Sequence, residues 1–559
     1  MTPNVLHKNQ EVLLTIKRMG INGEGIGYYK RLAVFVPFAI PGEEVVVRIT
    51  ELNEQYAKGK IVKIKAQSEK RIQPKCPYYE QCGGCQLLHL DYHEHGRMKK
   101  EIVMECFNRY YNGTLNEKIF KDTIDMENPY HYRNKAKLPV RYDGEKLVTG
   151  LYAFDSNKLV YIEDCLVEKE DIRVAVKEIC EYLSKHQVIA YNPKMRDGIL
   201  RHLVLRSSTK TNEIQVTLIL FKYDQRTINI AKELMNINNV KSVYVSINSE
   251  VDAIENFGVE TFKVVGNDVI EESLGKYSFK LLPTAFFQLN RTQTEKLYSH
   301  IVDVAKLTGN ENVVDAYCGV GTIGIWLSEY AKEVRGIDTN KEGIKNAIHN
   351  AQDHGLDNAR FYTGDILTYL TKWRKEGFIP DVLVVDPPRT GLDLRLINYL
   401  QQFPINKIVY VSCNPATLAK NCNHLQKKYQ ILKVQPFDMF PQTSNVETLV
   451  CLSKKTEKHI NIDVEFGEGK GQVSLKKLQE ELNEQKPKKK TTYKDIQAYI
   501  EEKYGFKVHT AYIAEVKRDL GLPMYDAPNA VDELKRPRSH PTAEMVEAIK
   551  DALKYFAII

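Results

Sequence analysis

The chain has 559 residues, of which 43% are apolar and 27% are charged. This length predicts three or four domains, and the composition is that of a folded globular protein, which excludes collagen-like and compositionally disordered chains. The sequence has no run of eighteen apolar residues, and its N-terminus has no secretory signal pattern, so we expect a cytoplasmic protein without a membrane span. The ten cysteines should then stay reduced and serve as ligands, nucleophiles or core residues. The formal net charge of +7 is compatible with a polyanionic partner but does not specify one.

Residues 1–67 show the pattern of a small β-barrel. From residue 10 to about residue 66, short runs alternate apolar and polar positions and are separated by glycines. OB-like barrels of this size often bind oligonucleotides through one face and its loops. The basic residues of this segment would suit a phosphate backbone, although the surface lysines of any small barrel would look the same. They are Lys17, Arg18, Lys30, Arg31, Lys58, Lys60, Lys63 and Lys65.

Two further segments predict folded domains. Residues 68–285 combine a cysteine-rich loop, short strands and a helix near 168–186, which predicts an α+β domain of mostly antiparallel character. Residues 286–456 alternate strands with helices in the manner of βαβ units. This alternation predicts a doubly wound, Rossmann-like α/β domain with a parallel sheet covered on both faces.

Residues 457–559 predict a linker followed by a small helical extension. The composition becomes polar, and the basic run KPKKK at 486–490 is typical of a flexible linker. Two short helices are predicted on either side of Gly505, with Thr510 as the cap of the second helix and Gly521 at its end. Such a pair is either a helix-turn-helix that contacts nucleic acid or simply two packed helices, so its role stays open.

A glycine-rich loop follows the first strand of the doubly wound domain. Gly319, Gly321 and Gly324 have the GxGxxG spacing, which lets the backbone turn sharply and brings a ligand to the N-terminus of the next helix. Asp338 ends the next strand, where its carboxylate can accept hydrogen bonds from ribose hydroxyls. These features fit nicotinamide-dependent and S-adenosylmethionine-dependent enzymes equally. Two more strand-end acids, for which helix capping is the plain alternative, are Asp315 and Asp365.

The motif that separates these classes is DPPR, which begins at Asp386 after the apolar strand DVLVV. Its rigid Pro-Pro pair presents the flanking groups at the carboxyl edge of the sheet, where methyltransferases that act on planar bases often have such a turn. The next strand ends at Cys413, which is followed by Asn-Pro. A lone cysteine at a strand end is often only a small buried hydrophobic residue. In a loop at this edge it is also a candidate nucleophile.

A nucleophilic thiol has a definite use if the substrate is uracil. Carbon 5 of uracil is a poor nucleophile, but addition of a thiolate to carbon 6 converts the ring into an enolate with an electron-rich carbon 5. Methylation of carbon 5 is then followed by removal of its proton and elimination of the thiolate. Glu447 directly precedes the last strand and can return to the same edge as the base. The target base must also leave any stack or pair to reach the pocket.

A second cluster of cysteines has the spacing of a metal site. Cys76, Cys82 and Cys85 form a C-x5-C-x2-C pattern in a glycine-rich loop, and Cys165 is a candidate fourth ligand. Four cysteines suit either an iron–sulfur cluster or zinc, and spacing alone does not separate the two. The plain alternative is a set of unrelated core cysteines.

The motifs FFQLN, DAYCGVGTIG, DPPRTGLD, SCNPATL and FPQTSNVE occur in this order behind a TRAM-like barrel and the cysteine loop. Together they resemble the bacterial 23S ribosomal RNA (uracil-5-)-methyltransferases over residues 10–455. The resemblance implies Cys413 as nucleophile, Glu447 as base and a [4Fe–4S] cluster on Cys76, Cys82, Cys85 and Cys165. It also implies an S-adenosylmethionine site formed by Gln288, Tyr317, Asp338 and Asp386. The chain departs from the family motif at Gln442 and Asn445, where relatives often have histidines.

We therefore expect methylation of carbon 5 of a uridine in 23S rRNA by a cytoplasmic monomer. The tRNA-modifying relatives typically lack both the barrel and the cysteine cluster, which favours ribosomal RNA. The alternatives are a tRNA uracil-5-methyltransferase and an idle fold that acts as a ribosome-assembly factor. An N6-adenine methyltransferase is less favoured, because Arg389 stands where those enzymes usually have an aromatic residue. The target nucleotide and the role of residues 457–559 stay open.

Overall fold

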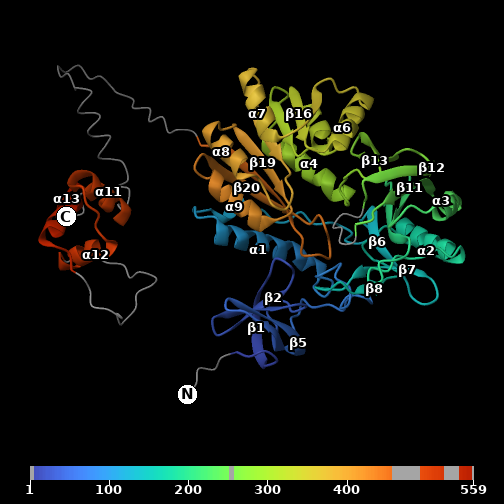
Figure 1. The fold of residues 1–559 in the computed structure, drawn as a ribbon, viewed down its shortest axis with the longest axis horizontal. Coiled ribbons are helices and arrows are strands. Elements are labelled where there is room, and N and C mark those ends of the chain that lie inside the picture. The colour runs from blue at the N-terminus through green and yellow to red at the C-terminus, as the bar shows by residue number, and fades with distance from the viewer. Residues whose placement is uncertain (1–5, 251–256, 456–491, 521–539, 557–559) are drawn as a thin grey trace. The chain divides into compact units, whose positions relative to one another are not determined.

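The computed structural model divides into two compact units, Met1–Glu457 and Lys458–Ile559. Figure 1 shows the elements of both. Within the part of the chain that it describes, no helix is long and apolar enough to cross a membrane. The described residues are 6–250, 257–455, 492–520 and 540–556.

The N-terminal residues form the predicted small barrel, in the strand order β1-β2-β3-β5-β4. Alternate residues of β1 are buried, so that Leu14 and Ile16 point inward, and Val34, Val47 and Ile49 meet them from other strands. Closure of the sheet leaves no free strand edge. The strands are β1 (Glu11–Met19), β2 (Gly25–Tyr29), β3 (Leu32–Val36), β4 (Glu44–Leu52) and β5 (Tyr56–Ala66).

A long helix, α1 (Tyr92–Tyr110), follows the cysteine-rich loop and is capped by the side chain of Asp91. The sequence analysis did not anticipate this helix. It packs against α9 (Pro415–Leu425) and β20 (Tyr429–Phe437), more than 300 residues further along the chain, and Figure 1 shows it between the barrel and these elements. The helix therefore connects the N-terminal segments to the last domain of the first unit.

The central domain is a seven-stranded sheet of order β12-β11-β10-β9-β6-β7-β8. Only β10 and β11 run parallel, so the expected mostly antiparallel character is found. Helices α2 (Glu170–Lys185) and α3 (Gln225–Lys232) pack their apolar side chains on one face of this sheet. The strands are β6 (Lys135–Tyr142), β7 (Leu147–Tyr152), β8 (Leu159–Tyr161), β9 (Leu200–Ser207), β10 (Ile214–Leu220), β11 (Val240–Ile247) and β12 (Glu260–Gly266); a hairpin of β13 (Ile270–Leu274) and β14 (Tyr277–Leu281) follows.

The last domain of this unit has the doubly wound sheet that the sequence predicted, with one difference. The order is β17-β16-β15-β18-β19-β21-β20, and the first five strands are parallel. β21 instead runs antiparallel to both of its neighbours, because β20 and β21 form a hairpin-like pair at the end of the domain. The strands are β15 (Asn312–Ala316), β16 (Glu333–Asp338), β17 (Ala359–Thr363), β18 (Val382–Val385), β19 (Lys407–Ser412), β20 and β21 (Glu447–Lys454).

Helices cover both faces of this sheet, and each face has its own apolar core. One core includes side chains of α4 (Arg291–Ala305), α5 (Thr322–Leu327) and α6 (Lys341–Asp353). The other includes side chains of α1, α9, α7 (Ile366–Lys375) and α8 (Leu394–Gln402). Strands buried on both faces read as continuous apolar runs, as in VLVV of β18.

The second unit contains three helices among its described residues: α11 (Tyr493–Tyr504), α12 (Thr510–Asp519) and α13 (Ala543–Tyr555). Gly505 ends α11 in the left-handed conformation with φ of 75°, as the glycine break predicted. The expected Thr510 cap is wrong, because the side chain of His509 accepts the capping bond from Ala511 N. Ile496, Ile513 and Ile549 join the three helices in one core. The predicted KPKKK linker and the expected helix end at Gly521 lie outside the described residues.

A fully buried ion pair joins α1 to the loop before β21. Lys99 Nζ donates to Asp438 Oδ1, and neither side chain is exposed to solvent. Tyr92 OH, also on α1, donates to Asp438 Oδ2 at 2.9 Å. Removing one partner of a buried pair leaves an uncompensated charge in the interior, which is strongly unfavourable.

We expect Lys99→Met to destabilise the first unit by about 3–5 kcal/mol, because it leaves the Asp438 carboxylate buried without its cation. Arg97→Ala is the matched control on the exposed side of the same helix, where an exposed ion pair contributes about 1 kcal/mol or less. Urea unfolding of the full chain, followed by circular dichroism, measures both. Equal costs for the two variants would contradict the assigned weight of the buried pair.

Candidate active site

Cys413 and Glu447 lie opposite each other at one edge of the doubly wound sheet. Cys413 directly follows β19, and Glu447 is the first residue of β21. The two strands are antiparallel with Ser412 paired to Thr448, so the next residue of one strand faces the preceding residue of the other. The structure thus brings together the two residues that sequence analysis assigned to nucleophile and base. Cys413 is half-buried, whereas Glu447 is buried.

The loops at this edge are held by local hydrogen bonds. The side chain of Asn414 caps α9 by accepting bonds from Ala416 N and Thr417 N. Its amide nitrogen donates to the Arg389 carbonyl oxygen at 3.2 Å, which ties the cysteine loop to the DPPR turn. Asp386 follows β18, and its backbone N–H points to the Ala316 carbonyl at 3.4 Å. The carboxyl ends of β15, β18 and β19 therefore meet beside Cys413.

The loop that carries Glu447 is held by groups from distant segments. Asn290 Nδ2 donates to the Met439 carbonyl at 3.0 Å, and Tyr132 OH donates to the Pro441 carbonyl at 2.9 Å. The N–H of Leu87, in the cysteine-rich segment, donates to the Gln442 carbonyl at 3.0 Å. Gln442 itself has φ of 68°, a left-handed conformation that costs a residue with a side chain about 1–3 kcal/mol. Its surroundings must therefore determine this conformation.

The charges around Cys413 act in opposite directions on its thiol. Burial and the Glu447 carboxylate raise the pKa of Cys413 above the ordinary thiol value, and the Arg389 guanidinium lowers it. Because the thiolate is the reactive form, Arg389 favours the nucleophile. Arg389 is exposed at the edge of the site.

Three carboxyl groups gather behind the thiol. Burial raises the pKa of Asp386 to about 7, and burial with the Asp386 charge raises the pKa of Glu447 well above its usual value. Burial raises the pKa of Asp315 to about 8. Asp315 Oδ1 and Glu447 Oε1 are buried without a hydrogen-bond partner among the described residues. A pair such as Asp386 and Glu447 holds a proton readily, so Glu447 has the basicity that proton removal from carbon needs.

The glycine loop borders a cavity of about 180 Å³. Tyr317 and Asp338 line it, together with Asp365 and Arg395. Gly319 N donates to Asp338 Oδ2 at 2.9 Å, and Gly319 has φ of 55° with nothing within 4 Å of an added Cβ, which leaves its backbone open to a ligand. Gln288 and Asp386 do not line this cavity. Arg395 was missed by sequence analysis, although the GLDLR run after DPPRT was a local signal.

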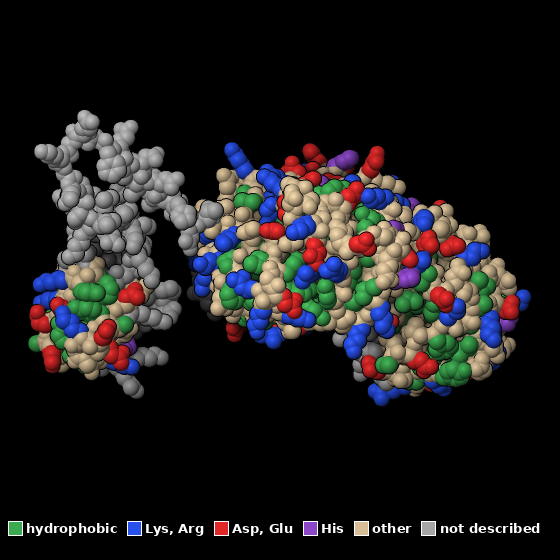
Figure 2. Space-filling view, turned by 90° about the horizontal axis from the view of Figure 1, so that it is seen from above, with side chains coloured by type: hydrophobic (Ala, Val, Ile, Leu, Met, Phe, Trp, Pro, Cys, Tyr) green, Lys and Arg blue, Asp and Glu red, His purple; other side chains and the backbone are tan. Residues whose placement is uncertain are grey.

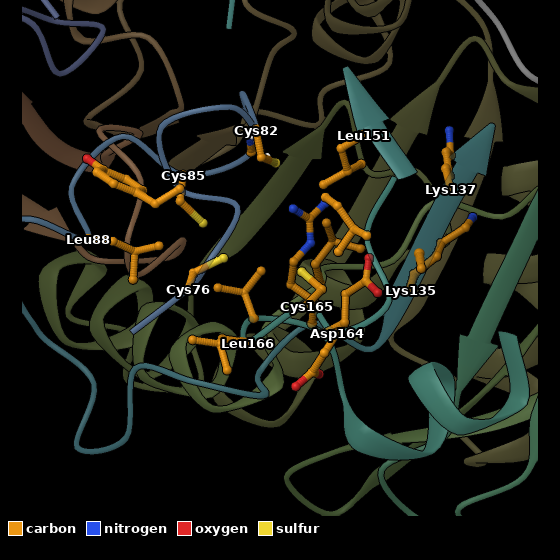
Figure 3. Close-up of a pocket in the computed structure, with 18 residues that line it drawn as sticks. Cys76, Cys82, Cys85, Leu88, Lys135, Lys137, Leu151, Asp164, Cys165 and Leu166 are labelled. Carbon is orange, nitrogen blue, oxygen red and sulfur yellow. Dashed lines mark hydrogen bonds between the residues drawn. The ribbon is translucent and has the colours of Figure 1, made fainter. Parts of the chain in front are cut away.

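The four cysteines of the second cluster line one cavity of about 150 Å³, shown in Figure 3. Burial and the neighbouring thiols raise the pKa of Cys85, and burial raises the pKa of Cys165 to about 12, which is the behaviour of thiols grouped in an apolar site. Gly84 N donates to Cys82 Sγ at 3.3 Å. Among the described residues, however, no group of three or more His, Cys, Asp or Glu side chains is arranged to hold a single metal ion.

Comparison with known proteins assigns the chain to a family. A model described as tRNA (Uracil-5-)-methyltransferase matches residues 91–455, and a TRAM-domain model matches residues 6–62. The chain belongs to the RNA (uracil-5-)-methyltransferase family. An uncharacterized RNA methyltransferase from Bacillus cereus is 46% identical over 452 residues, which cover 80% of this chain and 98% of that protein. The Pyrococcus abyssi tRNA (uracil-54, C5)-methyltransferase, in complex with S-adenosyl-L-homocysteine, matches with a TM-score of 0.62 at 26% identity and covers 79% of this chain and 100% of that one.

Family membership identifies the general class of reaction that this protein catalyses. The chain is an S-adenosylmethionine-dependent RNA methyltransferase with an N-terminal TRAM domain. In this RNA (uracil-5-)-methyltransferase, the region matched by the methyltransferase model contains the glycine loop, DPPR, Cys413 and Glu447. The barrel β1–β5 falls within or close to the range matched by the TRAM model.

We expect Arg389→Ala to move the alkylation of Cys413 by iodoacetamide to higher pH. Alkylation requires the thiolate, and loss of the guanidinium removes a charge that lowers the pKa of Cys413. Peptide mass spectrometry at a series of pH values isolates Cys413 from the other cysteines. Lys375→Ala, an exposed cation on α7, is the control and should leave the curve in place. An alkylation curve that is unchanged or shifted to lower pH in Arg389→Ala would contradict the effect of Arg389 on the pKa of Cys413.

Proposed function

We propose that this methyltransferase forms 5-methyluridine in 23S rRNA, with Cys413 as the covalent nucleophile and Glu447 as the general base. The observation that carries the proposal is the register of β19 and β21, which sets the thiol and the carboxyl group face to face beside the DPPR turn. A planar base inserted between them would meet both groups at once.

The residues at the edge would act in sequence on the flipped-out base. The Cys413 thiolate, favoured by Arg389, forms a bond to carbon 6 of uracil, and the carbon 5–carbon 6 double bond becomes an enolate. S-adenosylmethionine supplies the methyl group that carbon 5 then takes. Glu447 accepts the proton from carbon 5, and the electrons of that C–H bond restore the double bond as the thiolate leaves. The raised pKa of Glu447 suits this step, because it makes the carboxylate a stronger base.

We assign the cofactor site to Gln288, Tyr317, Asp338 and Asp386. A different observation supports each part of this assignment. Tyr317 and Asp338 line the cavity beside the glycine loop, and Asp338 lies where a ribose would place its hydroxyls. Asp386 lies at the carboxyl edge next to Cys413. Gln288 precedes α4, and its carbonyl accepts a bond from Asn134 Nδ2 at 3.3 Å.

We also propose a [4Fe–4S] cluster on Cys76, Cys82, Cys85 and Cys165. Zinc requires four ligands that converge on one point at about 2.3 Å, whereas each cysteine of a cluster binds a different iron. The four thiols line one cavity, and the resemblance to the 23S rRNA enzymes favours the cluster over zinc. The cysteine loop is bonded on both sides: Gly83 N donates to the Tyr152 carbonyl at 2.9 Å, and Leu87 N reaches Gln442. A cluster here would fix the cysteine loop between the central domain and the loop that carries Glu447.

The remaining predictions are compatible with this activity and stay proposals. We keep the division into residues 1–67, 68–285, 286–456 and 457–559, a cytoplasmic monomer, and RNA contact by the barrel as proposals. Ribosomal RNA is preferred over tRNA because the cysteine cluster accompanies the barrel. The tRNA alternative draws support from the description of the family model and from the Pyrococcus abyssi enzyme. An idle assembly factor is less favoured, because nucleophile and base are both present.

We expect the full chain to transfer labelled methyl groups from S-adenosylmethionine to unmodified 23S rRNA and to leave tRNA unlabelled. Nucleoside analysis should identify 5-methyluridine. Cys413→Ala should reduce the rate by at least about 10³-fold, because it removes the attacking group. With 5-fluorouridine in the rRNA there is no proton to remove at carbon 5, so the wild type should form a covalent adduct through Cys413. Cys106→Ala, a half-buried thiol on α1, is the control and should behave as wild type.

Each alternative has its own outcome in this experiment. Methylated tRNA without methylated rRNA would replace the ribosomal substrate and keep the chemistry. Tight rRNA binding with no methyl transfer would favour the assembly factor. Glu447→Gln adds a test of the base: it should accumulate a protein–RNA adduct on ordinary rRNA, because the proton at carbon 5 stays in place.

We expect Cys85→Ser to remove iron and acid-labile sulfide from protein purified without oxygen. The serine hydroxyl is a poor ligand for iron, and Cys85 is one of the four cysteines that line the cavity. Cys106→Ser is the matched control and should retain both elements. Limited proteolysis should show faster cleavage near Gly83 in Cys85→Ser, because the loop loses its anchor. Zinc without sulfide in the wild type would replace the cluster with a single-ion site.

A further inference from the structure

The face of the central sheet opposite α2 and α3 carries a set of basic side chains from two neighbouring strands. Alternate residues of β6 and β9, such as Leu138 and Leu203, pack under the helices, so the residues between them point to the other face. Figure 3 shows Lys135 and Lys137 side by side on β6, with their ammonium ends directed away from the four cysteines. We call this set the basic strip: Lys135, Lys137 and Arg141 on β6, and His202 and Arg206 on β9.

The buried end of the basic strip is a pair of basic side chains that face each other. Lys135 and Arg206 are direct partners across β6 and β9, and they are only 9% and 4% exposed. Like charges directly opposite each other destabilise a sheet, and burial increases the cost. Burial and the Arg206 charge lower the pKa of Lys135 to about 6, and burial lowers the pKa of Arg206 to about 10. Burial therefore opposes a proton on both side chains at once in the free protein.

Among the described residues, acidic side chains form no ion pair with the basic strip. Within the described part of the chain, no member of the basic strip has a carboxylate within ion-pair distance; the nearest ion pairs of this domain, Lys169 with Asp171 and Lys210 with Glu271, lie apart from it. The charge of Glu272 reaches Arg206, but its carboxylate oxygens are bonded to Thr209. The face of the molecule in Figure 2 instead intersperses cations with acids.

Polar atoms along the basic strip also lack partners. Arg206 Nε and His202 Nδ1 are buried without a hydrogen bond among the described residues. Gln215 on β10 is the cross-strand partner of Arg206, and its Nε2 is also buried without a hydrogen bond among the described residues. Buried polar nitrogens without partners are unfavourable, so the described part of the protein does not satisfy this end of the strip by itself.

The basic strip begins beside the proposed active site. Arg206 donates to the Ala285 carbonyl at 2.5 Å and Lys135 to the Pro283 carbonyl at 3.4 Å, both in the loop that leads to Gln288. Between them and Gln288, Phe286 is 69% exposed, which leaves its ring free to stack on a base. From Lys135 to Arg141 the strand extends about 20 Å, long enough to follow several phosphates.

We propose that the basic strip binds the phosphodiester backbone of the RNA strand that carries the target uridine. The identity of this polyanion rests on the proposed function, whereas the case for an anion rests on basic side chains that have no ion pair among the described residues. Phosphate contacts of this kind position a nucleic acid without reading its sequence. The strip therefore determines how the strand approaches the edge at Cys413, and the choice of uridine is left to other contacts.

The test measures the salt dependence of RNA binding, in a Cys413→Ala background so that no methylation interferes. The probe is a 23S rRNA transcript, and the variant is Lys137→Ala with Arg141→Ala at the accessible end of the strip. Each lost phosphate contact should make the slope of log affinity against log salt shallower by about 0.7–0.9, so the double variant should lose about 1.4–1.8. Lys177→Ala with Lys232→Ala, exposed on α2 and α3 over the other face, is the matched control and should keep the wild-type slope.

An unchanged slope in the strip variant, or an equal loss in the control, would overturn the proposal. Arg206→Met tests the buried end: it should weaken binding while the melting temperature stays the same or rises, because an apolar side chain replaces a desolvated guanidinium. A clear drop in melting temperature would assign the buried end a structural role and remove it from the strip. Normal slopes with no 5-methyluridine in the wild type would reject the proposed function alone, and a wild type that binds no RNA would overturn both.

Discussion

The catalytic edge depends on one reversal of strand direction. In a parallel sheet, the residues that follow the strands gather at the carboxyl edge, and this brings Tyr317, Asp386 and Cys413 together. Glu447 precedes its strand, so it reaches the same edge only because β21 runs antiparallel to β19. A shift of one residue in this pairing would turn Glu447 to the other face of the sheet. The chemistry of the edge therefore requires both the direction and the register of β21.

The antiparallel direction of β21 requires a loop that crosses the edge of the sheet, and other segments of the first unit hold that loop in place. Most residues of the loop from residue 438 to residue 446 are buried, and buried backbone carbonyls need donors. The donors come from the cysteine-rich segment at Leu87, from Tyr132 before the central sheet, and from Asn290 before α4. Lys99 of α1 neutralises Asp438 at the start of the loop. The N-terminal half of the chain thus takes part in building the catalytic edge, although the nucleophile and base both lie in the last domain.

Sequence patterns predicted the features that are local. Alternation predicted the barrel, and the glycine loop, DPPR and SCNP motifs located the ligand edge because each follows an apolar strand. They failed for α1, since its buried positions include His95 and Lys99, residue types that hydrophobic periodicity assigns to solvent. The direction of β21 was also missed, because strand polarity is decided by pairing rather than by the strand's own residues. The contact of Lys99 with Asp438 joins residues 339 positions apart, which no local pattern records.

In the described part of the first unit, one group of acidic side chains and one group of basic side chains have buried polar atoms without hydrogen-bond partners. At the carboxyl edge, Asp315 and Glu447 have buried oxygens without partners, with Asp386 beside them. On the central sheet, the basic strip has buried nitrogens in the same state. Each group destabilises the free protein, and each complements a charge that the proposed reaction brings: a cationic sulfonium donor for the acids and a polyanionic strand for the strip. Ligands that bind only the folded state shift stability in its favour, so both substrates should offset strain that the free enzyme retains. On the proposed function, replacing either group by a better packed, neutral one would remove a substrate contact.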